Sequence, residues 1–149
     1  MSERPAQERR LRITGLHHVT IICRDLERTT AFYRDVLGLP LAEQTVNDDD
    51  PDARHFVFGD GEAGTLVTAF EYPEMEAGQV GVGSTHHFAL CVESEEELEA
   101  WRAWLASRGV PCTEVLDRRR CKSVYLRDPD GHIIELATRG PGSGGGTPA

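Results

Sequence analysis

The chain has 149 residues, a formal net charge of −9 and a pI near 5.1. Apolar residues make up 39% and charged residues 28%, which is typical of a globular domain or of two small modules that share a core. The acidic balance argues against nucleic acid or an anionic membrane as the main partner. No apolar run has membrane-spanning length, and the N-terminal MSERPAQERRLR lacks the apolar core of a secretory signal. We therefore expect a cytoplasmic protein with no membrane partner, whose four cysteines are reduced thiols.

The first half of the chain predicts the order β-α-β-β-β. Asp25 is a suitable N-cap for a helix that Gly38 ends as a left-handed residue. Residues 47–52 are rich in Asp and lack the spacing of an EF-hand, so they indicate a solvated loop. Residues 1–12 indicate a flexible arm. The first module, residues 13–72, is expected to contain strands at 13–23, 41–46, 55–58 and 65–72.

After a linker rich in Gly and Glu at 73–84, the same order returns. Ser94 and Glu97 form a capping box for the second helix, which Gly109 closes. The second module, residues 85–139, is expected to contain strands at 85–92 and 113–116, and then two strands within 121–138 that are joined by the turn Asp128–Gly131. The Gly- and Pro-rich residues 140–149 indicate a second flexible terminus. The fold class that this order predicts is α+β, with two tandem βαβββ modules.

A nearly constant offset indicates that the two modules are copies of one unit. The landmark pairs are His18 and His87, Gly38 and Gly109, and Gly64 and Gly131, with separations of 69, 71 and 67 residues. Four equivalent positions around the pseudo-twofold axis would then hold His18, Thr68, His87 and Glu135. Three of these four residues are metal ligands by type.

Glu135 gives the strongest indication of a metal. It interrupts an otherwise apolar strand, and an unpaired carboxylate in a buried strand costs several kcal/mol. No Lys or Arg lies within three residues of it in the sequence. We therefore predict that His18, His87 and Glu135 bind a divalent metal ion. Two imidazoles and one carboxylate leave coordination positions open to substrate and favour an anionic oxygen ligand.

Three sequence stretches carry a resemblance to a known family. They are GLHHVT at 15–20, TVNDDDP at 45–51 and DRRRCKSVYLRDPDGHIIELAT at 117–138. The chain resembles the vicinal oxygen chelate superfamily, which contains glyoxalases, bleomycin and fosfomycin resistance proteins and extradiol dioxygenases. Within it, the chain is most similar to the ring-cleaving dioxygenases of para-hydroquinones. The resemblance implies an incomplete barrel of paired βαβββ modules around one metal site.

The resemblance also implies an activity and a set of site residues. The implied function is an Fe(II)- or Mn(II)-dependent, extradiol-type dioxygenase that cleaves a hydroxylated aromatic ring, a hydroquinone or a catechol, with O2. Fe(II) is the first expectation for the cofactor and Mn(II) the second. The implied catalytic residues are His86, Tyr125 and Arg118, and the implied substrate-binding residues are His17 and Thr20. Without the resemblance, His17 and His86 could equally be surface residues and Arg118 a solvated loop residue.

Two other functions use the same fold. A metal-dependent lyase, isomerase or transferase of the glyoxalase or fosfomycin-resistance kind can use the same two histidines and one glutamate, and chains of two modules are usual there. A ligand-binding protein of the bleomycin-resistance kind would not need the intact ligands. Because a single βαβββ module leaves unpaired sheet edges, we also expect a homodimer, in which each site draws ligands from both chains.

Overall fold

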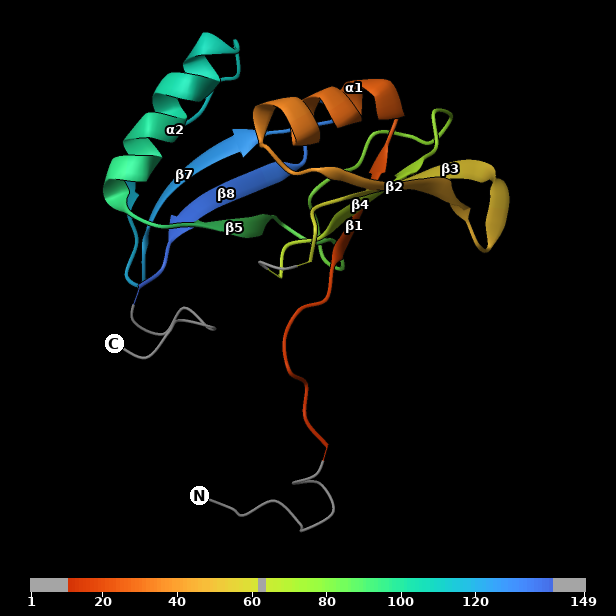
Figure 1. The fold of residues 1–149 in the computed structure, drawn as a ribbon, viewed down its shortest axis with the longest axis horizontal. Coiled ribbons are helices and arrows are strands. Elements are labelled where there is room, and N and C mark those ends of the chain that lie inside the picture. The colour runs from red at the N-terminus through yellow and green to blue at the C-terminus, as the bar shows by residue number, and fades with distance from the viewer. Residues whose placement is uncertain (1–10, 62–63, 141–149) are drawn as a thin grey trace.

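The structure is a computed structural model that describes residues 11–61 and 64–140 (Figure 1). The first half contains β1 (Val19–Cys23), α1 (Leu26–Thr30), the π-helical turn η2 (Ala31–Val36), β2 (Leu41–Asn47), β3 (Asp50–Phe58) and β4 (Val67–Glu71). The second half contains β5 (Phe88–Val92), α2 (Glu95–Ser107), β6 (Leu116–Asp117), β7 (Lys122–Arg127) and β8 (Ile133–Thr138). The flexible termini expected at 1–12 and 140–149 lie almost wholly outside the described residues.

The two halves form sheets with the same strand order. The first sheet has the order β1-β4-β3-β2 and the second the order β5-β8-β7-β6. In each sheet the first strand pairs parallel to the last, and the other pairs are antiparallel. The helices of both modules lie on the same side of the sheets, and the opposite sheet faces, which no described helix covers, are called the open faces (Figure 1). The predicted α+β fold of two βαβββ modules is confirmed.

Local capping explains where the helices begin and end. The Asp25 carboxylate accepts hydrogen bonds from the backbone N–H groups of Glu27 and Arg28 at the start of α1. The Ser94 hydroxyl accepts one from the N–H of Glu97 at the start of α2. After η2, Gly38 has φ +77°, which the chain needs in order to turn into β2.

Strand alternation separates a core face from an open face. On β7 and β8 the side chains of Val124, Leu126, Ile134 and Leu136 point toward the helices and are at most 3% exposed. Glu135 lies between the last two and therefore points to the opposite face. Buried apolar side chains of both modules belong to one continuous cluster, so the two halves share a core.

Polar contacts also join the modules. The buried Tyr33 hydroxyl donates to Asp128 Oδ2 over 2.8 Å. The indole Nε1 of Trp104 donates to the carbonyl oxygen of Val36 over 2.8 Å. These bonds fix η2 of the first module against the turn before β8 and against α2.

Several strand boundaries differ from those that the sequence predicts. Both first strands start later than expected, at Val19 and Phe88, so each pair of histidines precedes its strand. The acidic segment is not a long loop: Asn47 Oδ1 accepts from the Asp49 N–H over 3.0 Å in a tight turn, and β3 already starts at Asp50. None of the described helices combines the length and apolar character that crossing a membrane requires.

Candidate metal centre

The strand register places the four equivalent positions as the repeat predicts. Thr20 lies opposite Thr68 in the first module, and Ala89 lies opposite Glu135 in the second. His18 and His87 each precede these positions by two residues. The open face of the second module therefore holds a histidine and a carboxylate, whereas the first module holds a histidine and a threonine.

In the second module the structure brings His87 and Glu135 together. His87 Nε2 lies 3.0 Å from Glu135 Oε1. The hydroxyl of the fully buried Ser123 donates to the other carboxylate oxygen, Oε2, over 2.6 Å. One oxygen of Glu135 is thus held by the protein, and the other is directed at the imidazole.

This spacing fits a shared metal ion. Ligand atoms about 2.1 Å from a metal ion, at right angles to each other, are about 3.0 Å apart. His87 Nε2 and Glu135 Oε1 have that separation. With Oε2 bound to Ser123, Glu135 can offer one oxygen to the ion while the hydrogen bond sets the plane of its carboxylate.

The protein keeps Glu135 ionised. Burial opposes ionisation, but hydrogen bonds from Ser123 and Tyr125 and the neighbouring His87 outweigh it and hold the pKa of Glu135 below its ordinary value. Glu135 is only 7% exposed. The carboxylate is therefore ready to bind a cation at neutral pH.

Tyr125 stands beside this pair. It lies directly opposite Glu135 in the β7–β8 ladder, and its ring meets the His87 ring edge to face at a centroid distance of 5.7 Å. Burial, reinforced by the Glu135 carboxylate, raises the pKa of Tyr125, although Arg118 acts in the opposite sense. The phenol therefore keeps its proton at neutral pH and can donate it. The Arg118 guanidinium lies 5.4 Å from the centre of the Tyr125 ring.

Two residues near the carboxylate were missed by the sequence prediction. Ser123 is one, and Cys121, whose Sγ lies 3.4 Å from Ser123 Oγ and 3.9 Å from Glu135 Oε2, is the other. Ser123 shares a face of β7 with Tyr125, and Cys121 directly precedes that strand, but neither residue type is by itself a signal for a site.

The first module has a pair of threonines where the second module has Glu135 and its strand neighbour. The hydroxyls of Thr20 and Thr68 are hydrogen-bonded to each other over 2.8 Å. His18 is exposed. Among the described residues only Asp25, Glu27 and Glu71 bring three ligand atoms within 4.8 Å of one another, so His18 does not join His87 and Glu135 within one chain.

The Arg54 side chain supplies the positive charge in that acidic cluster. The guanidinium of Arg54 bonds both carboxylate oxygens of Glu27 and both of Glu71, at 2.8 to 2.9 Å. Asp25 caps the helix. The cluster is explained by these contacts and gives no indication of a metal.

Each of the two histidines predicted to bind a metal contacts the histidine before it. His17 Nδ1 lies 2.8 Å from His18 Nδ1, and His86 Nδ1 lies 2.9 Å from His87 Nδ1. His17 and His86 are exposed.

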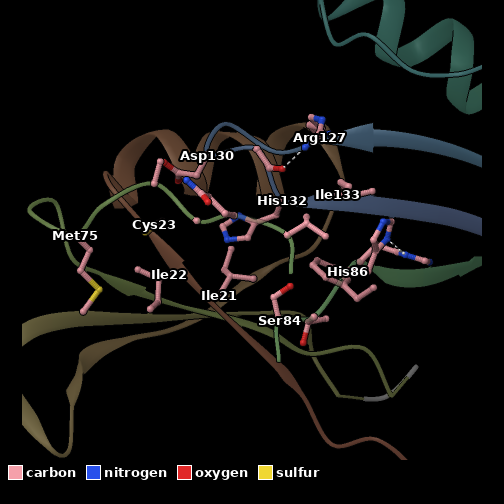
Figure 2. A pocket seen from close by; sticks show the side chains of 18 of the residues that line it. Ile21, Ile22, Cys23, Met75, Ser84, His86, Arg127, Asp130, His132 and Ile133 are labelled. Atoms are coloured by element: carbon pink, nitrogen blue, oxygen red, sulfur yellow. Dashed lines mark hydrogen bonds between the residues drawn. The ribbon is translucent and has the colours of Figure 1, made fainter. Parts of the chain in front are cut away.

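A cavity of about 530 Å³ lies between the modules, next to the His87–Glu135 pair. Its walls come from β1, the segment after β4 and the turn before β8, and His86 and Ser84 lie on one side of it with Met75 on the other (Figure 2). His87 and Thr20 line the cavity, whereas Glu135 and Tyr125 do not. The cavity therefore adjoins the pair and does not enclose it.

The fold and the histidine–carboxylate pair define a protein of the paired βαβββ class. The model of the Glyoxalase/Bleomycin resistance protein/Dioxygenase superfamily matches residues 15–136, and the chain belongs to this superfamily of metal-dependent enzymes. One solved structure with this fold is a FosX variant from Listeria monocytogenes in complex with Mn(II), 24% identical with a TM-score of 0.65, in which the match covers 85% of this chain and 93% of that chain.

Relatives carry two kinds of name. A protein of Bacillus subtilis named "Putative ring-cleaving dioxygenase MhqE" is 39% identical over 70% of this chain and 35% of its own length. The metallothiol transferase FosB of Staphylococcus saprophyticus is 32% identical over 85% of this chain and 78% of its own length. A solved Bacillus subtilis structure named "putative dioxygenase" has a TM-score of 0.76 and 34% identity, and the match covers 85% of this chain and 41% of that chain. The chain spans less than half the length of the ring-cleaving relatives that it matches.

Proposed function

We propose that the protein is a metal-dependent dioxygenase that cleaves a hydroxylated aromatic ring, a hydroquinone or a catechol, with O2. The observation that carries the proposal is the buried Glu135 carboxylate, ionised and 3.0 Å from His87 Nε2, with Tyr125 and Arg118 beside it. The names of three Bacillus subtilis relatives, the putative ring-cleaving dioxygenases MhqA, MhqE and MhqO, support the ring-cleaving reaction.

His87, Glu135 and His18 are the proposed ligands of Fe(II) or, as the second choice, Mn(II). When bound, such an ion supplies open positions at which a substrate oxygen and O2 can meet, a property of two-histidine, one-carboxylate sites. Both atoms of O2 enter the ring-opened product, so the overall reaction needs no external reductant. One carboxylate leaves a divalent ion with a surplus positive charge, which favours a phenolate as the substrate ligand.

The remaining residues have roles in binding and proton transfer. Tyr125, whose phenol keeps its proton and hydrogen-bonds Glu135, would redirect that hydrogen bond to a substrate oxygen. Arg118 adds positive charge next to the same ring and favours an anionic substrate. Thr20, which lies on the exposed face of β1 in the same module as His18, is the proposed substrate contact from the first module. His17 and His86, which directly precede the proposed ligands His18 and His87, belong to the same site.

We propose that His18 reaches this site from a second copy of the chain. His18 is exposed and does not join His87 and Glu135 within one chain. The open sheet faces carry exposed apolar side chains such as Ile22, 45% exposed, which a second copy would cover. A homodimer would then hold two sites, each made of one module from each copy.

Mixing inactive variants tests this sharing. His18→Ala and Glu135→Ala chains, unfolded and refolded together, should regain activity, because each mixed dimer contains one site with all three ligands. The same two variants refolded separately are the control. A protein that is monomeric by sedimentation, or mixtures that stay inactive, would contradict shared sites.

Oxygen uptake tests the reaction itself. The protein, reconstituted anaerobically with Fe(II) or Mn(II), should consume about one O2 per substrate with a member of a hydroquinone and catechol panel. Tyr125→Phe should keep its metal and lose about ten- to a thousandfold in turnover. No uptake with any member of the panel in the metal-loaded protein would refute the dioxygenase proposal.

A thiol transferase is the second candidate, because the chain covers 78% of the length of FosB and less than half that of the ring-cleaving relatives. This activity uses the same ligands and needs no O2. Consumption of fosfomycin together with a small thiol, under anaerobic conditions and dependent on Glu135, would favour it over ring cleavage.

A further inference from the structure

The two pairs of neighbouring histidines have the same geometry although they are 69 residues apart. The rings of His17 and His18 meet at 82° with centroids 5.0 Å apart, and those of His86 and His87 at 83° and 5.1 Å. In both pairs the close contact joins Nδ1 to Nδ1, at 2.8 and 2.9 Å. The same contact in both modules indicates a feature of the repeated unit.

The contact constrains which nitrogen carries a proton. Two imidazole nitrogens at hydrogen-bond distance need one N–H and one lone pair between them. His87 uses both of its ring nitrogens, because Nδ1 faces His86 and Nε2 faces Glu135 Oε1. If Nε2 gives its lone pair to a metal ion, neutral His87 must carry its proton on Nδ1, and that N–H points at His86 Nδ1.

We infer that His17 and His86 are positioning residues for the ligand histidines that follow them. Each accepts a hydrogen bond through its own Nδ1 and so holds the next imidazole in the tautomer and orientation that leave Nε2 free for the metal ion. The inference rests on the proposed metal centre. It gives His17 and His86 a function that requires no contact with the substrate.

A histidine suits this position because the direction of the bond reverses. Without a metal ion, His87 Nε2–H can donate to the Glu135 carboxylate, so Nδ1 is an acceptor and His86 must donate. With the ion bound, His87 Nδ1–H donates and His86 must accept. The exposed imidazole of His86 can do both by exchanging its proton between its nitrogens through solvent.

Asparagine provides the matched control. Its amide oxygen and nitrogen occupy the position of Nδ1, and the amide can accept or donate by rotating. Alanine can do neither. Since His86 is exposed, both variants are expected to fold, which circular dichroism checks.

The experiment measures Mn(II) affinity in the full chain by electron paramagnetic resonance of the free ion, without substrate. His86→Ala should weaken binding by about 10- to 100-fold, the usual effect of losing a hydrogen-bond partner of a metal ligand. His86→Asn should stay close to wild type, and His17→Ala and His17→Asn should repeat the pattern.

Two results would overturn the inference and one would overturn its basis. Wild-type affinity in His86→Ala, while Glu135→Ala loses the ion, would leave the proposed metal centre intact and remove the positioning role. Equal weakening in His86→Ala and His86→Asn would show that the imidazole acts by something other than this hydrogen bond. Unchanged binding in Glu135→Ala would refute the metal centre itself.

Discussion

The hydroxyl of Tyr33 offers a sharp test of how the two modules are joined. Tyr33 is fully buried in the first module and donates to Asp128 Oδ2 of the second over 2.8 Å. Its ring stacks on Phe58 at a centroid distance of 5.5 Å. Tyr33→Phe removes the hydrogen bond and keeps the ring, so the loss isolates one polar contact between modules.

The expected cost follows from the charge of the acceptor. A hydrogen bond to a charged group contributes about 1.5–3 kcal/mol. His132 Nδ1 and two backbone N–H groups still bind the Asp128 carboxylate in the variant, so the charge does not become unpaired. For a chain of this size, that loss corresponds to a decrease in Tm of about 3–12 °C.

Urea unfolding followed by circular dichroism measures the effect. The midpoint should fall while the slope m stays constant, since the surface exposed on unfolding does not change. Tyr72→Phe is the matched control: its hydroxyl bonds Asn47 and Asp50 in a half-exposed position, so its removal should cost less than about 1 kcal/mol. Equal effects of the two substitutions would refute the assigned role of the Tyr33–Asp128 bond.

Three further predictions concern pH, backbone and metal. The hydrogen bond to Asp128 raises the pKa of His132. Burial opposes the ionisation of Asp128, but its hydrogen bonds and its contact with His132 lower its pKa. The contribution of Asp128 to the free energy of unfolding should therefore be lost as pH falls below about 3.8. The contribution of His132 is complete below its ordinary pKa of 6.5 and should be lost as pH rises through its higher folded value; His132→Gln should remove that alkaline loss from urea midpoints measured between about pH 3 and 9. Gly59→Ala should destabilise by at least about 3 kcal/mol, because φ is +102° and a Cβ would collide with a backbone carbonyl oxygen, whereas Gly38→Ala, with φ +77° and open space, should cost about 1 kcal/mol in the same assay. Ser123→Ala should weaken Mn(II) binding by about tenfold or more by releasing one oxygen of the carboxylate ligand; unchanged affinity in that titration would contradict its role.

The order of elements could be predicted because its signals are local. Asp25 and Ser94 cap helices with their own neighbours, and the turn Asp128–Gly131 contains residues that form turns whatever surrounds them. The strand starts could not be predicted in this way, since they depend on distant partners. β1 begins at Val19 because its parallel partner, β4, begins at Val67.

The candidate site was predictable in part for the same reason. An isolated carboxylate in an apolar strand marks Glu135 in the sequence, but a serine in a strand carries no comparable signal, and Ser123 was missed. The contact of His132 with Asp128, at 2.6 Å, was also missed although the two residues are four apart in one turn. Tyr33 and Asp128 are 95 residues apart, and only the packed fold reveals that they meet.

The two modules carry different residues at equivalent strand positions. Opposite Glu135 stands Tyr125, whereas the equivalent pair in the first module is Thr68 and Val57. Thr68 is 5% exposed and satisfies its hydroxyl with Thr20, so the first module needs no cation. It can offer the exposed His18.

The second module instead holds a charge that the protein itself has already stabilised. Ser123 binds one oxygen of Glu135 and His87 faces the other, and although burial opposes ionisation these contacts lower the pKa of Glu135. A buried carboxylate with such partners does not oppose folding. If the proposed ion binds here, we expect the module to fold without it, unlike small domains whose folding depends on their metal.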